Sequence, residues 1–372
     1  MPLQPMEDSP RVKRYHRAQR VLSVTGFLLD LAALLVLLFT GWTIALRAYA
    51  EHWTARPALS LLIYLALFAL INQAVGLPVD FLKGFWLEHR YNLSNLTLWG
   101  WSKDHLKGFM VGGVLGTLGL EILYWTMRRW PSAWWIISGT VFVGFSVLLA
   151  NLAPVLILPI FYRFKPLENQ ALTERLLELS RRAGTRVRGV FEWKLSEKTK
   201  KANAALLGLG NTRRIILSDT LLGKFSEDEV EAVLAHELGH HVHRHILQGM
   251  ALQTAARYLG FYLVNVALRG LGHHFGFVGL ADFANLPLLI LVGTALSLVL
   301  LPAVNAHSRR MERQADSYSL QAIRDRLAFI TSMEKLADLN LSERKPHPWI
   351  EFFFHSHPSI EKRIGFAQKF PG

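Results

Sequence analysis

Residues Ser226–His245 read S-E-D-E-V-E-A-V-L-A-H-E-L-G-H-H-V-H-R-H, and the rest of the chain can be understood from this stretch. Ser226 followed three residues later by Glu229 forms a capping box, which predicts that a helix begins here. Acidic residues fill the first turn, and histidines with Arg244 fill the last, as the helix dipole favours. The sequence therefore predicts one helix that carries a cluster of histidines.

The segment His236-Glu237-Leu238-Gly239-His240 lies inside that helix. Two histidines at this spacing project from one helical face, close enough for both imidazoles to bind one zinc ion. Glu237 points away from the ligand pair but can still reach a water at the metal. A surface histidine cluster is the alternative, because short motifs recur by chance. The cap, the apolar pattern of the helix and the partner motifs below favour zinc, one ion per chain.

The third ligand has to come from another part of the chain. The longer zinc motif, with a glycine and a third histidine further along the helix, is absent, because His243 and Ile246 occupy those positions. His243 falls on nearly the same face as His236 and His240, so it is a possible extra ligand, although a role at the helix end is favoured.

Two carboxylates on a later predicted helix can complete the site. Glu312 and Asp316 are the first and last residues of E-R-Q-A-D and share one helical face. One carboxylate would complete a catalytic zinc site with an open position for water. The other can accept the free N–H of a ligand histidine and fix its orientation. This spacing alone would indicate only an amphipathic surface helix; combined with the two histidines, it favours zinc.

The composition indicates a membrane protein. Hydrophobic residues make up 51% of the 372 residues, and cysteine is absent, which excludes disulfides, a thiol nucleophile and cysteine-ligated zinc. The net charge of +13 could indicate nucleic acid, but no nucleic-acid-binding signature accompanies it. In a chain with long apolar runs, basic loops beside anionic lipid are the favoured explanation. We expect a lipid bilayer as partner and no nucleic acid.

Long apolar stretches predict about six membrane-spanning helices, since ~20 helical residues cross a ~30 Å hydrocarbon core. A cleaved signal peptide at the first stretch is rejected, because the apolar run exceeds the ~7–15 residues of a signal core. Ile246–Leu268 is a weaker candidate interrupted by polar residues, and a soluble core helix is its alternative. The other five stretches are Val21–Leu46, Ala58–Val79, Phe109–Met127, Ala133–Phe161 and Leu286–Ala306.

Six spans place the segments richest in Lys and Arg on one side, which is therefore expected to be the cytoplasm. Asp30, Glu121 and Arg257 lie at membrane depth, where charge is expensive. Pairing of these charges inside the bundle is one explanation, and a wet cavity between helices is the favoured one. The expected order is a cytoplasmic tail (1–20), four membrane helices (21–162) with a cytoplasmic loop (80–108), an α+β catalytic insert (163–245), two membrane helices (246–306) and a C-terminal catalytic segment (307–372).

The insert and the C-terminal segment have their own predicted elements. A helix over 167–182, a strand over 186–193 and a hairpin of 202–208 with 213–218 are expected in the insert. Beyond the last span, we expect helices over 307–326 and 327–340, and a short helix after Pro358.

Taken together, these motifs resemble the type I CAAX prenyl endopeptidases, the integral-membrane zinc gluzincins that also process yeast a-factor. The similarity runs in order over roughly residues 60–370. It rests on H-E-L-G-H at 236–240, Glu312-x-x-Ala315-Asp316, Asn203-Ala204 with Gly208, the loop 88–107, and His355-Ser356-His357-Pro358 with Arg363.

The resemblance implies a role for each of these residues. His236, His240 and Glu312 would hold zinc, Glu237 would be the general base, and Asp316 would support a ligand. His357, with Arg363, would polarise the scissile carbonyl or stabilise the oxyanion. A strand beginning at Asn203 and Ala204 would bind the substrate backbone as an added β-strand.

The expected fold is mainly α: a polytopic helical membrane bundle of about six spans, with a small cytoplasmic α+β gluzincin-type zinc peptidase domain. The resemblance implies in addition that the bundle encloses a large water-filled chamber. Eukaryotic members have seven spans, and this chain apparently lacks the first.

We therefore expect a membrane-embedded zinc metalloendopeptidase that acts on a peptide or protein substrate. The substrate is either a prenylated C-terminal peptide or, in quality control, a misfolded or surplus membrane protein. A site-2-type intramembrane protease is disfavoured because 227–231 is too acidic for lipid. A non-catalytic transporter or scaffold is the alternative from another class. Compact loops favour a bacterial inner membrane over an endoplasmic reticulum membrane, with the site facing the cytoplasm.

Overall fold

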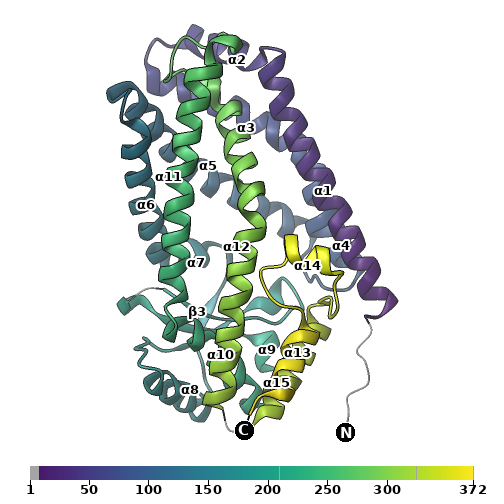
Figure 1. The fold of residues 1–372 in the computed structure, drawn as a ribbon. Helices are drawn as coiled ribbons and strands as arrows, with labels where there is room; N and C mark the ends of the chain where they lie inside the picture. The colour runs from purple at the N-terminus through teal and green to yellow at the C-terminus, as the bar shows by residue number, and fades with distance from the viewer. Residues whose placement is uncertain (1–7, 209, 324, 372) are drawn as a thin grey trace.

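The computed structural model describes residues 8–208, 210–323 and 325–371. Figure 1 shows long helices standing side by side in the upper part of the molecule and a small α+β domain at its lower end. The α12 helix runs from one part into the other, so the two parts are joined by continuous secondary structure as well as by loops. The predicted mainly helical membrane fold with a small sheet domain is confirmed.

The upper part is a helical bundle. Two π-helical turns, Leu82–Trp86 and Ala153–Ile157, connect α3 to α4 and α6 to α7. The second turn contains Pro154, which cannot donate a backbone hydrogen bond to the preceding turn. The helices are α1 (Pro10–Phe39), α2 (Trp42–Trp53), α3 (Pro57–Phe81), α4 (Leu87–Arg90), α5 (Leu98–Arg129), α6 (Trp134–Leu152), α7 (Leu158–Phe161), α11 (His245–Leu271) and α12 (Leu286–Ala322).

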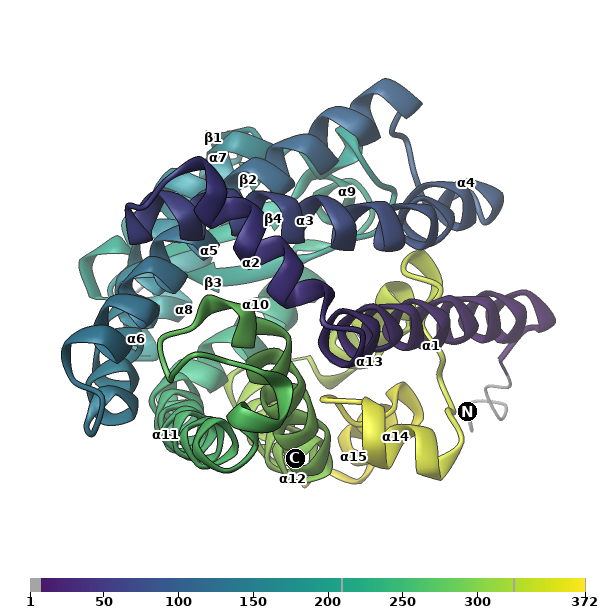
Figure 2. The ribbon, with the colours of Figure 1, turned by 90° about the horizontal axis from the view of Figure 1, so that it is seen from above.

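Five helical segments in the described part of the chain are long and apolar enough to cross a membrane. The sixth predicted stretch forms α11, but its polar residues exclude it from this group. Because α11 lies beside α6 and α12 in both ribbon views, it is part of the bundle, and its crossing stays a prediction (Figures 1 and 2). The five segments are Pro10–Phe39, Pro57–Arg90, Leu98–Arg129, Trp134–Phe161 and Phe283–Ala322.

The first predicted span, Val21–Leu46, is wrong in its bounds. The helix already begins at Pro10, because the Ser9 side chain caps it and proline suits the first helical position. It ends at Phe39, and Gly41 with a φ of 77° redirects the chain into α2. Part of the segment predicted as a polar tail is therefore helical, and the apolar run is divided between two helices.

Helix α5 is open on two opposite faces along its middle turns. Large apolar side chains, including Met110, Val114 and Leu118, are exposed along one face. The opposite face carries Gly108, Gly112 and Gly116, where an added Cβ would meet no atom within 4 Å. Lipid on the apolar side and an open interior on the glycine side would explain both faces. The enclosed chamber remains a prediction, and this arrangement supports it.

The lower domain is built on a four-stranded sheet in the order β1-β2-β4-β3. The predicted hairpin forms, since β3 and β4 pair antiparallel with Ala204 opposite Leu217. Leucine and valine side chains from α8, α10 and the sheet make one buried core. The elements are β1 (Phe164–Pro166), α8 (Gln170–Arg182), β2 (Val190–Trp193), β3 (Ala204–Leu207), β4 (Arg214–Ser218), α9 (Asp219–Leu222) and α10 (Glu227–Val242).

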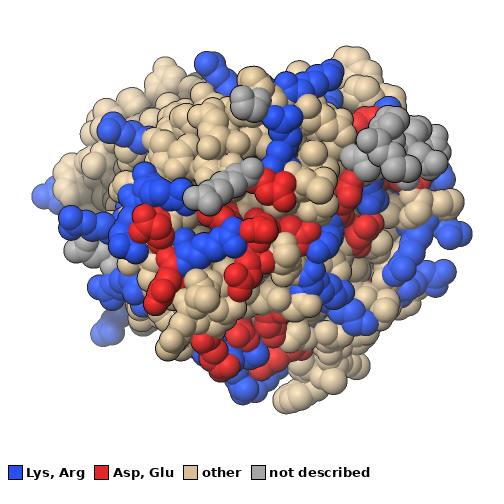
Figure 3. Space-filling view, turned by 90° about the horizontal axis from the view of Figure 1, so that it is seen from below, with Lys and Arg blue, Asp and Glu red and all other residues tan. Residues whose placement is uncertain are grey.

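The C-terminal segment returns to this domain. The helix predicted over 307–326 is the continuation of α12, which extends without a break for 37 residues. It is followed by α13 (Arg326–Leu339), α14 (Pro348–Phe354) and α15 (Ile360–Lys369), the last being the short helix expected after Pro358. Seen from below, Lys, Arg, Asp and Glu side chains are interspersed over this end of the molecule, as expected for a surface in water (Figure 3).

Candidate active site

Helix α10 begins as its sequence predicts. The Ser226 hydroxyl accepts a hydrogen bond from the Glu229 N–H at 3.3 Å, and the Glu229 carboxylate accepts one from the Ser226 N–H at 2.8 Å. This capping box satisfies two backbone donors that would otherwise lack helical partners. One face of the helix, including Val230, Leu234 and Leu238, is buried in the domain core.

Helices α10 and α12 cross in close contact at Gly239. An added Cβ there would lie 2.8 Å from Ala315 Cα, closer than real side chains come, and 3.0 Å from Ala315 O, tighter than most real contacts. A second contact holds the crossing, because the Ser319 hydroxyl donates to the Ala232 carbonyl at 2.8 Å. The glycine between the two motif histidines thus allows α12 to approach and bring Glu312 to them.

We predict that Gly239→Ala separates the two helices and weakens metal binding. The new methyl meets backbone rather than a flexible side chain, so overpacking should cost about 1–3 kcal/mol of folding stability. Thermal unfolding and metal titration of the purified variant measure both effects. Gly249→Ala is a matched control, since its Cβ would meet no atom within 4 Å. Unchanged metal affinity in Gly239→Ala would contradict this explanation of the glycine.

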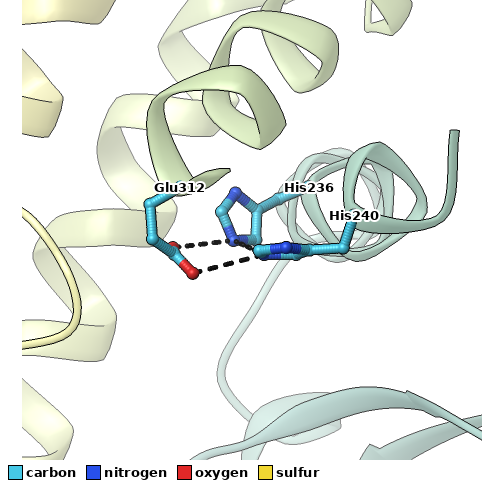
Figure 4. Close-up of side chains that lie close together, drawn as sticks. All are labelled: His236, His240 and Glu312. Atoms are coloured by element: carbon cyan, nitrogen blue, oxygen red, sulfur yellow. Dashed lines mark hydrogen bonds and ion pairs between the residues drawn. The ribbon is translucent and has the colours of Figure 1, made fainter. Parts of the chain in front are cut away.

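Three predicted ligands meet where the helices cross. His236 Nε2 lies 3.3 Å from His240 Nε2 and 3.3 Å from Glu312 Oε2, and His240 Nε2 lies 3.3 Å from Glu312 Oε1. Figure 4 shows the two imidazoles from α10 facing the carboxylate from α12. These residues form a group whose ligand atoms all lie within 4.8 Å of one another, as a shared metal ion requires.

This donor set fits a zinc ion. Ligand atoms about 2.0–2.1 Å from a tetrahedral zinc lie roughly 3.3 Å apart, which matches the observed separations. Glu312 Oε2 is buried and accepts no hydrogen bond from any residue that the structure describes. A buried carboxylate oxygen without a partner is costly, and a bound cation would satisfy it.

Asp316 and Arg363 support His236 from behind. Asp316 Oδ1 lies 2.8 Å from His236 Nδ1, and Arg363 donates to both oxygens of Asp316, at 2.6 and 2.9 Å. Burial and Arg363 disfavour a charged imidazole, but the bond to Asp316 and the ion-pair contact with Glu312 outweigh them and raise the pKa of His236 to about 9. The carboxylates therefore favour positive charge at this imidazole, from either a proton or a metal.

His357 reaches the cluster from the loop between α14 and α15. Its Nε2 lies 3.3 Å from Glu312 Oε1, and its side chain is 61% exposed, so a substrate could contact it. With Arg363, it lines a cavity of about 490 Å³. The backbone before this loop is held by Arg309, which donates to the carbonyls of Glu351 and His355 at 2.9 and 2.7 Å. The sequence analysis did not identify Arg309.

Ala204 is the first residue of β3, an edge strand of the sheet, and Asn203 directly precedes it. The Asn203 N–H donates to the Ser218 hydroxyl, and its carbonyl accepts from the Ser218 N–H, both at 2.9 Å. The Asn203 side chain is exposed, whereas Ala204 is buried in the domain core. Since β3 packs against α10, this edge strand lies beside the helix that carries the histidines.

His245 contacts the cluster and Gln314 contacts His245, and neither role was predicted from the sequence. His245 Nδ1 lies 3.0 Å from His240 Nδ1, and Gln314 Oε1 lies 2.9 Å from His245 Nε2. His243, the possible extra ligand, lies at the end of α10, and its exposed ring stacks on that of His245. Gln314 lies two residues after Glu312 in the carboxylate motif, and this position could have indicated that its side chain lies near the cluster.

Comparison with known proteins agrees with this arrangement. The model of peptidase family M48 matches residues 166–370, and the model described as "CAAX prenyl protease N-terminal, five membrane helices" matches residues 5–163. Together with the fold and the His-His-Glu cluster, these matches define a multi-pass membrane metalloendopeptidase. The chain belongs to peptidase family M48, and the resemblance to CAAX prenyl proteases is confirmed.

Individual relatives cover nearly the whole chain. An "Uncharacterized metalloprotease YhfN" of Bacillus subtilis is 32% identical over 361 residues, which are 96% of this chain and 84% of the relative. "CAAX prenyl protease 1" of Saccharomyces cerevisiae is 28% identical over 95% of this chain and 84% of its own length. The crystal structure of S. mikatae Ste24p superposes with a TM-score of 0.87 at 25% identity, covering 96% of this chain and 88% of that one.

Proposed function

We propose that this membrane metalloendopeptidase depends on one zinc ion held by His236, His240 and Glu312. The observation that carries the proposal is the triangle of ligand atoms, each 3.3 Å from the next, around a carboxylate oxygen that has no hydrogen-bond partner among the described residues. A surface histidine cluster would not need a buried carboxylate from a distant helix. A non-catalytic scaffold would not need Glu237 beside His236.

Each residue around the site has a proposed step in hydrolysis. Zinc, when bound, polarises the scissile carbonyl and lowers the pKa of water towards ~7. Glu237, half-buried beside His236, takes a proton from the attacking water and later delivers it to the leaving amine. His357 donates to the oxyanion that develops on the substrate, an interaction worth roughly 10²–10³ in rate for a single donor.

Asp316 and Arg363 are proposed to position His236. The sequence resemblance suggested that Arg363 assists at the carbonyl, but its two bonds to Asp316 favour a role in holding that carboxylate. We predict that Asp316→Asn weakens zinc binding about 10–100-fold, because the ligand imidazole loses its charged partner. Competition with a chelator measures the change. Asp338→Asn is the control, since Asp338 bonds Arg344 at the surface and should not alter zinc binding.

The substrate is proposed to bind as an extended peptide along the free edge of β3, with its backbone paired to Ala204. The N–H and carbonyl of Asn203 are already bonded to Ser218, so Asn203 is proposed to contact the substrate through its exposed side chain. The S. cerevisiae relative is named "CAAX prenyl protease 1", and the matching crystal structure is of Ste24p. These two matches favour a prenylated C-terminal peptide as the substrate. The B. subtilis relative carries no substrate in its name, and quality control of membrane proteins is the second candidate.

The test compares a farnesylated peptide with the same peptide lacking the lipid, using purified full-length protein in detergent or vesicles. We expect cleavage of the farnesylated peptide, inhibition by a zinc chelator and recovery on adding zinc. Equal cleavage of both peptides would favour quality control over CAAX processing. Cleavage that persists after complete zinc removal would contradict the proposed mechanism.

The domain with the site is proposed to face the cytoplasm, in a bacterial inner membrane. The supporting observations are the excess of Lys and Arg predicted for that side and the charged lower surface in Figure 3. Since the chain lacks cysteine, single cysteines at Glu361 and Glu51 can report orientation by labelling with an impermeant reagent. Labelling of Glu361→Cys from outside intact cells would contradict the proposed orientation.

A further inference from the structure

The turn between α10 and α11 brings a buried histidine back beneath the cluster. Arg244 adopts a left-handed conformation with a φ of 55°, which is uncommon outside glycine, and it reverses the chain directly after α10. His245, the first residue of α11, is thereby placed against His240 and is only 4% exposed. Strained backbone persists where the surrounding structure requires it, so the position of His245 calls for an explanation.

The hydrogen bonds of His245 define a direction. Gln314 Oε1, 2.9 Å from His245 Nε2, can only accept, so His245 carries its proton on Nε2. The Nδ1 of the neutral ring then has a lone pair, which can accept a hydrogen bond from an Nδ1–H of His240, whose Nδ1 lies 3.0 Å away. His240 is thus held as the tautomer whose Nε2 presents a lone pair to the cluster.

His245 gives His240 the kind of hydrogen-bond partner that Asp316 gives His236. A histidine that binds a metal through one nitrogen usually donates the other N–H to a fixed acceptor, which sets its tautomer and orientation. For His236 that acceptor is Asp316. For His240 no carboxylate is within reach of Nδ1 among the described residues, and His245 occupies the corresponding position.

We propose that His245 and Gln314 are positioning residues that orient His240 for metal binding, an inference that rests on the zinc site proposed above. Gln314 comes from α12, two residues after Glu312, so the same helix supplies the third ligand and the end of this chain of hydrogen bonds. Docking of α12 against α10 and α11 therefore brings the ligands together and orients one of them.

The test measures zinc affinity by competition with a chromophoric chelator, with zinc alone as the ligand and purified full-length protein. His245→Leu, which has no acceptor, should bind zinc about 10–100-fold more weakly. His245→Asn should recover most of that loss, since its amide oxygen can take the place of Nδ1. His243→Leu is the matched control: it removes the neighbouring stacked, exposed imidazole and should leave zinc affinity unchanged.

Substitutions at Gln314 test the direction of the hydrogen bonds. Gln314→Glu keeps an acceptor for the His245 N–H and should retain zinc affinity, whereas Gln314→Leu should lower it. If the amide donated instead, Gln314→Glu would weaken binding as much as Gln314→Leu, which would overturn the proposed direction.

A purely structural role is separated by the thermal unfolding of zinc-stripped protein. Without zinc, the His245→Leu variant should unfold at nearly the same temperature as the wild type, because the bond between His245 and His240 is proposed to act on zinc binding rather than on folding. Wild-type zinc affinity in His245→Leu, or equal weakness of the Leu and Asn variants, would overturn this proposal alone. Absence of zinc binding by the wild type would overturn the zinc site as well.

Discussion

Glu237→Gln should lower kcat for peptide hydrolysis by about 10²–10⁴-fold, the typical contribution of a positioned general base. Glutamine has nearly the shape of glutamate but cannot accept a proton at neutral pH. Because Glu237 is not one of the three clustered ligands, zinc content and thermal stability should stay at wild-type values. Single-turnover cleavage of the farnesylated peptide, with metal content measured on the same sample, tests both parts.

The matched control for this variant is Glu227→Gln, which changes an acidic residue in the first turn of the same helix. It should leave cleavage nearly unchanged. A Glu237→Gln protein that retains zinc and still cleaves at the wild-type rate would show that another group takes the proton. Loss of zinc along with activity would show that Glu237 is needed to build the site.

Glu312→Gln should remove most of the zinc and, with it, the activity. The carboxylate is the only charged ligand of the cluster and is buried between two imidazoles. Partners of ligand residues typically contribute 10–100-fold to metal affinity, so loss of a charged ligand should weaken binding by on the order of 10²-fold or more. Elemental analysis and chelator competition give the stoichiometry and the affinity.

The control for Glu312→Gln is Arg313→Gln, an exposed neighbour on the same helix that should retain one zinc per chain. Excess zinc should partly restore activity to Glu312→Gln if the variant keeps its fold. Stoichiometric zinc binding with unchanged affinity in this variant would mean that the third ligand is a different residue.

Much of the fold and site could be predicted because short sequence motifs determine helix starts, turns and the spacing of ligand side chains. The capping box at Ser226 marked the start of α10, and the spacing of His236 and His240 indicated ligands on one face. The hairpin of β3 and β4 followed from its turn residues. The pairing with Glu312 depended on combining two motifs, each of which is weak alone.

The remaining features depend on tertiary contacts that no local pattern reveals. The division of α1 from α2 arises at one glycine inside an apolar run. The unbroken α12 joins a membrane segment to a soluble one, although polarity changes along its length. His245 and Arg309 act through partners that are distant in sequence, and the close approach at Gly239 is visible only when α12 is in place.

The proposed chemistry requires α10 and α12 to meet around one zinc ion. X-ray data collected on either side of the zinc absorption edge, from crystals of the wild-type protein, test it directly. We expect one strong anomalous peak per chain, within bonding distance of His236 Nε2, His240 Nε2 and a Glu312 carboxylate oxygen. A crystal structure with zinc bound elsewhere, or with Glu312 turned away from the imidazoles and no metal between them, would contradict it.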